Sequence, residues 1–280
     1  MRAAIQGDRY QVIGHPIRHS LSPKIHQTFA EQTQEAVTYT RADVDPKAFA
    51  AYVRRFFSLG GKGLNITVPH KVAAFQLADE LDQAGRVAEA VNTLYYRHGK
   101  LVGTNTDGVG FVRDLTQRHR FSVAGNRVLM LGAGGAARGL MLPLLACQPS
   151  VLAISNRTTA AAQDLVKRFQ PHAEGCHLQI AEAGALQQPF DLVINATAIG
   201  LAGATVEWPV GAIQQAFCYD LSYAGGAAFA RWAARSGASQ SEDGLGMLVE
   251  QAAESFQIWR NKMPLTEPAY QELRAELVAT

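Results

Sequence analysis

Short apolar runs alternate with longer segments whose apolar residues recur at helical spacing. Apolar runs bounded by turn residues predict strands, and apolar residues three or four positions apart predict helices with one buried face. The predicted strands are residues 10–14, 38–44, 63–68, 93–97, 100–103, 177–181, 190–195 and 218–221, with two more inside 127–156. The predicted helices are residues 23–31, 46–58, 71–82, 108–119, 227–235, 245–259 and 267–279, with one more inside 127–156.

The segment 46–58 shows the helical pattern most clearly. Its large apolar residues are spaced i, i+3, i+4, i+7 and i+8 and fall on one face, which predicts a helix packed on a core; they are Phe49, Tyr52, Val53, Phe56 and Phe57. Residues 93–103 predict a hairpin around His98 and Gly99. The alternation predicts an α/β fold with a domain junction near residue 108, and leaves open which domain the last two helices join.

Residues 127–156 predict a dinucleotide-binding unit. An apolar run ends at Gly132, an apolar segment of helical length follows, and a second apolar run ends at Asn156. In such a unit the first glycine permits a tight turn and the second lets the backbone approach a pyrophosphate, which the helix N-terminus then binds. The residues expected to hold the pyrophosphate are Gly132, Ala133, Gly134, Gly135, Ala136 and Ala137.

The end of the second strand of this unit predicts the cofactor. An NAD site usually has a carboxylate there for the ribose hydroxyls, whereas a 2′-phosphate requires a cation. The chain has Asn156, Arg157 and Thr158 and no acidic residue at this position. We therefore predict NADP. The alternative is that these residues only begin the next helix, with Thr158 or Thr159 as its N-cap.

Composition narrows the class of protein. The chain has 280 residues, 48% of them hydrophobic, and a net charge of +2 without a basic block. These values suit a globular enzyme of one or two domains and argue against a nucleic-acid partner. Three widely spaced cysteines predict reduced thiols rather than a disulfide or metal site, and neither a signal peptide nor a membrane span is predicted. We expect a cytoplasmic protein without a metal cofactor.

Two serines lie at the first predicted strand-to-helix transition. Ser22 followed by Pro23 is typical of a helix start, so simple capping is one interpretation. Capping does not explain Ser20. Two hydroxyl groups beside a helix N-terminus could instead bind a small carboxylate.

A second polar motif surrounds the third predicted strand. Asn65 and Thr67 lie on one face of that strand and could point into a single cleft. Lys71 falls in the first turn of the next predicted helix, where the helix dipole disfavours a cation. A solvated surface lysine is the alternative, and His70 is interpreted as structural.

Asn92 and Asp107 belong to two further polar motifs, at residues 90–93 and 103–108. Asp107 alone would be interpreted as the cap of the helix that begins near Gly108. Beside a nucleotide site, however, Lys71 and Asp107 together could serve the oxidation of a secondary alcohol by hydride transfer. That reaction needs a group that removes the hydroxyl proton and a cation or donor that stabilises the negative charge developing on oxygen.

The motifs together resemble the shikimate dehydrogenase family over nearly the whole chain. They are YQVIGHPIRHSLSPKIH (10–26), GLNITVPHK (63–71), AVNT (90–93), GTNTDGVGF (103–111), GAGGAARG (132–139), NRT (156–158), INATAIG (194–200) and GLGMLVEQAAESFQIW (244–259). The resemblance implies two α/β domains: residues 1–107 with 246–280 bind substrate, and residues 108–245 form a Rossmann domain for NADP. It also implies reversible reduction of 3-dehydroshikimate to shikimate, in aromatic amino acid biosynthesis.

The resemblance assigns roles to individual residues. It makes Lys71 and Asp107 the catalytic pair and Ser20 and Ser22 the ligands of the substrate carboxylate. Other expected substrate residues are Asn65, Thr67, Asn92, Tyr223 and Gln251. Expected cofactor residues, besides the glycine turn and Asn156, Arg157 and Thr158, are Ala196, Thr197, Ala198, Gly244 and Met247.

Three positions depart from the family pattern. Ala161 stands where members often have a second arginine, which could weaken NADP preference, and residues 224–228 lack the usual proline and threonine after Tyr223. Glu89 replaces a usual glycine. A quinate or dual shikimate/quinate dehydrogenase using NAD is one alternative function, and a binding protein without catalysis is another. The presence of both Lys71 and Asp107 argues against the latter. The oligomeric state stays open, with a homodimer as one option.

Overall fold

The computed structural model describes residues 7–182, 185–197 and 208–279. The chain divides into two compact units: unit 1 comprises Met1–Gly110 and Leu248–Thr280, and unit 2 comprises Phe111–Met247. The chain passes between the units inside two helices, α5 (Asp107–Arg113) and α9 (Leu245–Arg260).

Unit 1 is built on a mixed six-stranded sheet with the order β2-β1-β3-β5-β6-β4. β1, β2 and β3 are mutually parallel, β5 is antiparallel to β3 and β6, and β4 is parallel to β6. The strands are β1 (Asp8–Gly14), β2 (Val37–Asp43), β3 (Gly63–Ile66), β4 (Glu80–Leu81), β5 (Thr93–Arg97) and β6 (Lys100–Thr104). The predicted hairpin of β5 and β6 is confirmed.

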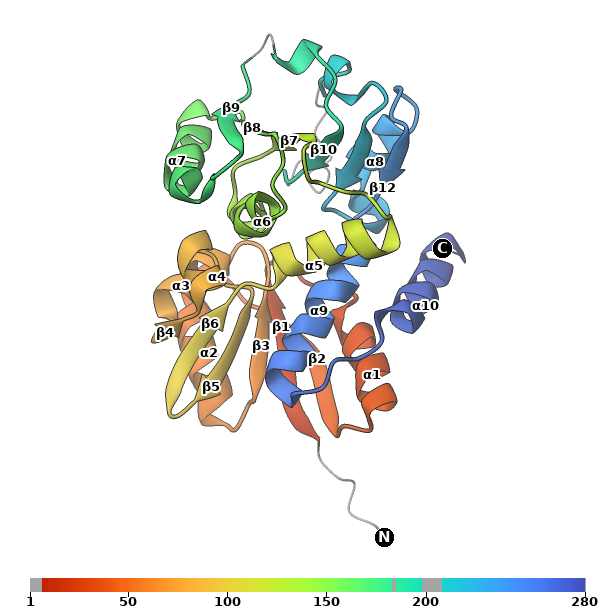
Figure 1. Ribbon diagram of the computed structural model, residues 1–280. Coiled ribbons are helices and arrows are strands. Elements are labelled where there is room, and N and C mark those ends of the chain that lie inside the picture. The colour runs from red at the N-terminus through yellow and green to blue at the C-terminus, as the bar shows by residue number, and fades with distance from the viewer. Residues whose placement is uncertain (1–6, 183–184, 198–207, 280) are drawn as a thin grey trace. The chain divides into compact units, whose positions relative to one another are not determined.

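The helices of unit 1 include α4, which the sequence does not predict. They are α1 (Ser22–Thr33), α2 (Phe49–Ser58), α3 (Lys71–Leu77), α4 (Gln83–Ala88), most of α9 and α10 (Thr266–Ala279). In α2 the apolar face is buried against the sheet, apart from the half-buried Tyr52. α10 lies beside α1 (Figure 1), where Lys24 and Thr28 contact the carboxylate of Glu272 at 3.0 and 3.1 Å.

The predicted helix 71–82 is wrong in its second half. α3 ends at Leu77, and residues 80–81 form the short strand β4 beside β6. The backbone of Asp79 donates to Leu101, and its carboxylate accepts from the N–H of Leu101, each at 2.8 Å. Asp82 then caps α4 by accepting from Gly85 at 2.8 Å. These backbone partners, supplied by a distant strand, override the local helical pattern.

Unit 2 contains a six-stranded, fully parallel sheet with the order β12-β11-β10-β7-β8-β9. The strands are β7 (Arg127–Leu131), β8 (Val151–Ser155), β9 (His177–Ile180), β10 (Leu192–Asn195), β11 (Phe217–Asp220) and β12 (Gln240–Glu242). The helices are α6 (Gly135–Ala146), α7 (Thr159–Phe169) and α8 (Ala228–Ala233), besides the C-terminal part of α5. β12 was not predicted, because its three residues are polar and form an edge strand.

The strand order of unit 2 fixes where a ligand can bind. From β7 the chain continues to β8 and β9 on one side, then returns to β10, β11 and β12 on the other. This is the order of doubly wound dinucleotide-binding sheets, which bind their ligand at the carboxyl ends of the strands where the direction reverses. The predicted fold class, two α/β domains with a Rossmann second domain, is confirmed.

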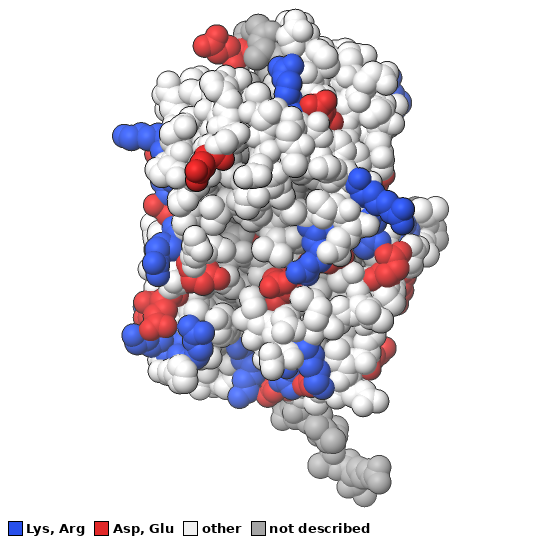
Figure 2. All heavy atoms as spheres, in the orientation of Figure 1, with Lys and Arg blue, Asp and Glu red and all other residues white. Residues whose placement is uncertain are grey.

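Surface charge and helix composition add two findings. Lys and Arg side chains are interspersed with Asp and Glu over the face shown in Figure 2, as expected from the nearly balanced composition. Within residues 7–182, 185–197 and 208–279, no helix combines the length and the apolar character needed to cross a bilayer.

Candidate active site

Lys71 and Asp107 form a close ion pair in unit 1. The Lys71 Nζ lies 2.5 Å from the Asp107 Oδ2, and the two side chains are 12% and 6% exposed. They are the first residues of α3 and α5. The positive end of the α3 dipole disfavours the Lys71 cation, and the Asp107 carboxylate offsets this effect. The alternative of a solvated surface lysine is therefore wrong.

Asp107 does not cap α5. Its own N–H donates to the side-chain oxygen of Asn105 at 3.0 Å, which satisfies one of the free N–H groups at the start of the helix. The second carboxylate oxygen of Asp107 instead accepts from Asn92 Nδ2 at 2.9 Å. Both oxygens therefore have fixed partners, and the carboxylate is held in one orientation.

Asn92 joins the ion pair to the rest of the polar cluster. Its Nδ2 also lies 2.9 Å from the Thr106 hydroxyl and 3.2 Å from Gln251 Oε1. Its Oδ1 accepts from the Thr106 N–H at 2.8 Å. Asn92 is 2% exposed and Gln251 8%. These bonds bring together four predicted site residues, Lys71, Asn92, Asp107 and Gln251.

Asn65 is held by Tyr39, Thr93 and Ser255. Its Oδ1 accepts from the Tyr39 hydroxyl at 2.8 Å, and its Nδ2 lies 2.9 Å from Ser255 Oγ and 3.1 Å from Thr93 Oγ1. Burial raises the pKa of Tyr39 well above its usual value, and a hydrogen bond with Ser22 offsets part of this rise. Tyr39 thus links Asn65 to the serine pair. No spacing in the sequence marks Tyr39 or Ser255.

The structure does not support the capping interpretation of Ser22. α1 begins at Ser22, and no side chain caps it. Instead the Ser20 hydroxyl accepts from the Ser22 N–H at 3.3 Å and donates to the Ser22 hydroxyl at 3.2 Å. Arg41 Nε donates to the carbonyl of Ser20 at 2.7 Å, which anchors the loop before the helix. The two hydroxyl groups therefore lie side by side at the N-terminus of α1.

Thr67 and His70 flank the start of α3. Thr67 is half-buried and follows β3, and among the described residues its hydroxyl has no hydrogen-bond partner. His70 is 1% exposed, its Nε2 lies 2.8 Å from the carbonyl of Val44, and its ring stacks on Phe49. Burial lowers the pKa of His70. The structural interpretation of His70 is confirmed.

The glycine turn of unit 2 lies between β7 and α6. Gly132 has φ +111°, and a Cβ there would approach the carbonyl oxygen of Ala196 to 2.9 Å, so the turn requires glycine. Gly134 precedes α6, and a Cβ there would meet nothing within 4 Å. Open space beside the backbone at a helix N-terminus fits a pyrophosphate. Ala133 and Ala137 are buried, and Gly135 and Ala136 are the first two residues of α6.

The residues after β8 fit a 2′-phosphate. Arg157 is exposed and, in the described part of the chain, makes no ion pair or hydrogen bond. Asn156 Nδ2 donates to the carbonyl of Thr158 at 2.9 Å and shapes this turn. Thr158 occupies the N-cap position of α7, but its side chain makes no capping bond. The capping alternative therefore explains the position of Thr158 but not Arg157.

The carboxyl ends of β10 and β11 are tied together by a buried pair that the sequence analysis missed. Asn195 Nδ2 donates to Asp220 Oδ1 at 3.0 Å, and the Thr197 hydroxyl donates to Asn195 Oδ1 at 2.6 Å. Burial raises the pKa of Asp220, and hydrogen bonds led by that of the Ser222 N–H offset part of the rise. This network orders the segment of Ala196 and Thr197; Ala198 lies outside the described residues.

The remaining predicted residues also belong to unit 2. Gly244 and Met247 are buried at the start of α9, and a Cβ on Gly244 would lie 2.3 Å from the carbonyl oxygen of Leu221. Tyr223 is half-buried between β11 and α8, so it belongs to a different unit from the other substrate candidates. It precedes a turn in which Ala224 has φ +54°.

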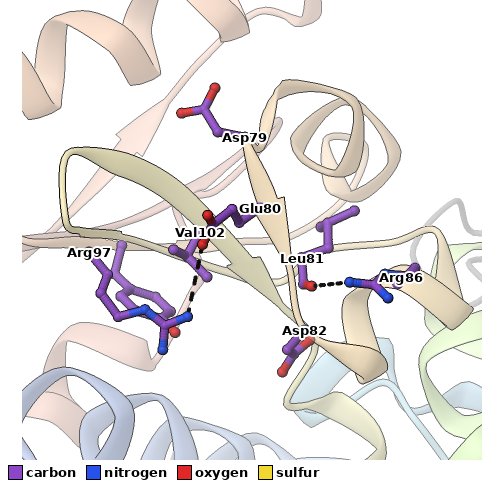
Figure 3. A pocket seen from close by; sticks show the side chains of 8 residues that line it. Asp79, Glu80, Leu81, Asp82, Arg86, Arg97 and Val102 are labelled. Carbon is purple, nitrogen blue, oxygen red and sulfur yellow. Dashed lines mark hydrogen bonds and ion pairs between the residues drawn. The ribbon is translucent and has the colours of Figure 1, made fainter.

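A cavity of about 550 Å³ in unit 1 is not this site (Figure 3). It lies around β4, and its charged residues already make hydrogen bonds or ion pairs within unit 1. Asp79 and Asp82 accept from backbone N–H groups, Glu80 pairs with Lys100 at 2.8 Å, and Arg86 donates to the carbonyl of Leu81 at 3.0 Å. The cavity therefore carries no separate chemistry.

The parallel sheet with its open glycine turn, and the buried lysine–aspartate pair of unit 1, define a two-domain, nicotinamide-dependent oxidoreductase. Residues 12–94 match the shikimate dehydrogenase substrate binding domain, residues 114–217 match shikimate / quinate 5-dehydrogenase, and residues 244–274 match the shikimate 5′-dehydrogenase C-terminal domain. The chain is 49% identical over 271 residues to the shikimate dehydrogenase (NADP(+)) of Alkalilimnicola ehrlichii, covering 96% of this chain and 99% of the relative. The chain belongs to the shikimate dehydrogenase family.

Solved structures agree with this assignment. An Ael1 enzyme from Pseudomonas putida is 40% identical with a TM-score of 0.85, covering 95% of this chain and 98% of that one. The shikimate 5-dehydrogenase of Thermus thermophilus, solved with NADP(H) and shikimate, is 27% identical with a TM-score of 0.82, covering 96% and 99%. The predicted family and oxidoreductase class are confirmed, and the predicted NADP agrees with the name of the relative.

Proposed function

We propose that this chain is an NADP-dependent shikimate dehydrogenase, which reversibly reduces 3-dehydroshikimate to shikimate in the pathway to chorismate and the aromatic amino acids. The observation that carries the proposal is the 2.5 Å contact of Lys71 with Asp107, inside a buried cluster of amide and hydroxyl side chains. Such a cluster suits a small polyhydroxy acid, because each substrate hydroxyl needs a polar partner when it leaves water.

The substrate would be held at both ends. The hydroxyl groups of Ser20 and Ser22 would donate to its carboxylate at the N-terminus of α1, where the helix dipole favours an anion. The ring hydroxyls would contact Asn65, Thr67, Asn92, Gln251 and Tyr223. Thr67 has an unused hydroxyl among the described residues, which supports a role as a direct ligand.

The Lys71 and Asp107 pair would manage the proton. When bound, NADPH supplies the hydride that reaches the carbonyl carbon, and the electron pair of the C=O double bond moves onto oxygen. Lys71 and Asp107 would supply the proton that converts this oxygen to a hydroxyl, and the Lys71 cation would stabilise its negative charge. The reverse direction returns the same proton to the pair.

The cofactor would lie along the carboxyl edge of the sheet in unit 2. Gly132, Ala133, Gly134, Gly135, Ala136 and Ala137 would hold the pyrophosphate. Asn156, Arg157 and Thr158 would hold the adenosine phosphate, and Arg157 has no competing acidic partner among the described residues. Ala196, Thr197, Ala198, Gly244 and Met247 would line the nicotinamide half.

A quinate dehydrogenase activity is the second candidate. The family model that matches residues 114–217 names both shikimate and quinate in its description, and Ala161 stands where members of the family often have a second arginine. The serine pair and Arg157 favour shikimate and NADP over quinate and NAD.

Initial rates with shikimate and quinate, each with NADP and NAD, test the proposal. We expect the highest kcat/KM for shikimate with NADP. A higher value for quinate with NAD would replace the proposal by the second candidate. Absence of turnover with all four pairs would favour a binding protein without catalysis.

We place the enzyme in the cytoplasm. Sedimentation velocity would decide whether it is the homodimer considered above.

A further inference from the structure

A buried carboxylate and a buried tyrosine hold the first turn of α9 in unit 2. Asp114 is 1% exposed and Tyr219 is completely buried. The Tyr219 hydroxyl donates to Asp114 Oδ2 at 2.7 Å, and its oxygen accepts from the N–H of Met247 at 3.2 Å. That N–H belongs to the first turn of α9 and has no partner within the helix. Tyr219 therefore supplies the partner that this backbone group needs.

Asp114 also contacts the same turn directly. A Cβ on Gly246 would lie 2.0 Å from Asp114 Oδ1, so the carboxylate packs against the Cα of Gly246. A negative charge at this position is favourable, because the N-terminus of a helix carries partial positive charge. Glycine at 246 is required by this close approach. The first turn of α9 is therefore fixed at two adjacent residues, Gly246 and Met247.

A widened helical turn holds Asp114 in place. Residues 114–118 form a π-helical turn, in which the N–H of His119 donates to the carbonyl of Asp114 at 3.2 Å. Bonding to the fifth residue widens the turn, so Arg118 and His119 both lie over the Asp114 side chain. Arg118 Nε is 2.8 Å from Oδ1, and His119 Nε2 is 3.3 Å from Oδ2. Arg118 and His119 thus engage both carboxylate oxygens of Asp114.

The residue that precedes α9 is bonded to the segment that follows β11 in the parallel sheet. Gly244 donates to the carbonyl of Ser222 at 2.9 Å, just after β11. The proposed pyrophosphate turn follows β7, and the proposed adenosine residues follow β8, on the other side of β7 from β10 and β11. A dinucleotide that crosses the edge at β7 must direct its nicotinamide half toward β10 and β11.

We infer that Asp114 and Tyr219 are positioning residues for the nicotinamide half of the cofactor, through the first turn of α9. Tyr219 fixes the backbone of Met247, and Asp114 fixes both Tyr219 and Gly246. The inference rests on the proposed function in taking NADP as the cofactor and in placing its nicotinamide half beside Gly244 and Met247. It does not depend on which substrate is reduced.

Two ligands separate this role from a general effect on the fold. NADPH spans the whole edge of the sheet, whereas adenosine 2′,5′-bisphosphate occupies the adenosine end alone. In Tyr219→Phe we expect the Kd of NADPH to rise about fivefold, the size expected for one lost hydrogen bond. The Kd of adenosine 2′,5′-bisphosphate should stay within twofold of wild type, and its binding also shows that unit 2 is folded.

Tyr10→Phe is the matched control. Tyr10 is a buried tyrosine of unit 1, 3% exposed, and its hydroxyl accepts from Arg260 at 3.3 Å. We expect both dissociation constants to match wild type in this variant. If Tyr219→Phe does not bind the bisphosphate, Asp114→Asn takes its place, because it keeps the side-chain volume while removing the charge beside Gly246.

The outcomes are distinct. Weaker NADPH binding with unchanged bisphosphate binding supports the inference. In a variant that still binds the bisphosphate, equal changes in Kd for both ligands, or no change for either, would overturn it. Because both titrations are made without substrate, failure of the inference is separate from failure of the proposed function, which the rate comparison with shikimate and quinate decides.

Discussion

The ammonium group of Lys71 lies 2.5 Å from the carboxylate of Asp107, although the two residues are 36 positions apart. They meet because α3 and α5 begin at these residues and Asn92 holds the second oxygen of Asp107. The pair is thus oriented by the protein alone. Such prior orientation is what a proton-transfer group needs, since little rearrangement is then required when substrate binds.

Lys71→Ala should separate proton transfer from binding. We expect kcat with shikimate to fall by about 10²–10⁴, the usual effect of losing a general acid–base group, while KM changes only a few-fold. Steady-state rates at saturating NADP measure both values. The control is Lys62→Ala, which removes an exposed lysine of the same unit. Unchanged turnover in Lys71→Ala would remove Lys71 from the mechanism.

Arg157→Ala should weaken use of NADP and leave NAD unaffected. A charge-assisted hydrogen bond contributes about 1.5–3 kcal/mol, so kcat/KM with NADP should fall about 10- to 100-fold. With NAD it should stay within twofold, because NAD has no 2′-phosphate. Arg235→Ala removes an equal charge from an exposed site of unit 2 and should change neither value. A parallel loss with both cofactors would contradict the assignment.

The sequence predicted the elements whose pattern is local. The strands β7, β8, β10 and β11 are mainly apolar runs that the sheet buries, and the turn at Gly132 follows from glycine spacing. β4 and β12 could not be predicted, because two or three partly polar residues carry no periodic signal and form strands only beside β6 and β11. Such strands are products of tertiary pairing.

The candidate site was predictable to the same extent. Lys71, Asn92 and Asp107 lie in polar motifs at the ends of strands and helices. Polar residues that capping or a turn does not fully explain are functional candidates at such positions. Tyr39 and Ser255 are not marked in this way, because each lies within a regular element. Ser255 lies 190 positions after Asn65 in the chain, and it contacts Asn65 because α9 packs into unit 1. Residues that hold other site residues from such distances leave no local pattern.

The backbone conformation at Glu89 explains why glycine is usual at this position in the family. It follows α4 with φ +46°, a left-handed conformation that glycine adopts without cost. We expect Glu89→Gly to be more stable than Glu89→Ala by about 1 kcal/mol, because both lose the carboxylate and only alanine keeps a Cβ. Urea unfolding measures the difference.

The same pair of substitutions at an exposed position inside α7 is the control for Glu89. At Gln163 the order should reverse, with glycine less stable than alanine by about 1 kcal/mol. If alanine were also the more stable residue at position 89, backbone conformation would not explain the usual glycine.

His26 should make the protein less stable in acid. It is completely buried and stacks on Tyr39 at 4.1 Å, and burial lowers its pKa from 6.5 to about 3 against an opposing effect of Asn65. The unfolded chain therefore binds a proton first as the pH falls. The stability that neutral His26 provides is lost progressively between pH 6.5 and about 3, by roughly 1.4 kcal/mol per pH unit.

His26→Phe tests this pH dependence. It keeps a ring on Tyr39 and removes the titration, and the ring nitrogens of His26 have no hydrogen-bond partner among the described residues. Between about pH 7 and about pH 4.5, the variant should lose roughly 2–3 kcal/mol less unfolding free energy than wild type. His172→Phe, at an exposed histidine, should lose as much as wild type. Equal losses in wild type and His26→Phe would show that His26 is not protonated on unfolding.

The most direct test of the proposed function is the reductive reaction itself. Purified protein is mixed with 3-dehydroshikimate and NADPH, the loss of reduced-nicotinamide absorbance is followed, and the product is identified by NMR. We expect one shikimate to form for each NADPH consumed, and Lys71→Ala to be slower by about 10²–10⁴. A wild-type protein that binds both compounds and leaves NADPH unoxidised would contradict the account.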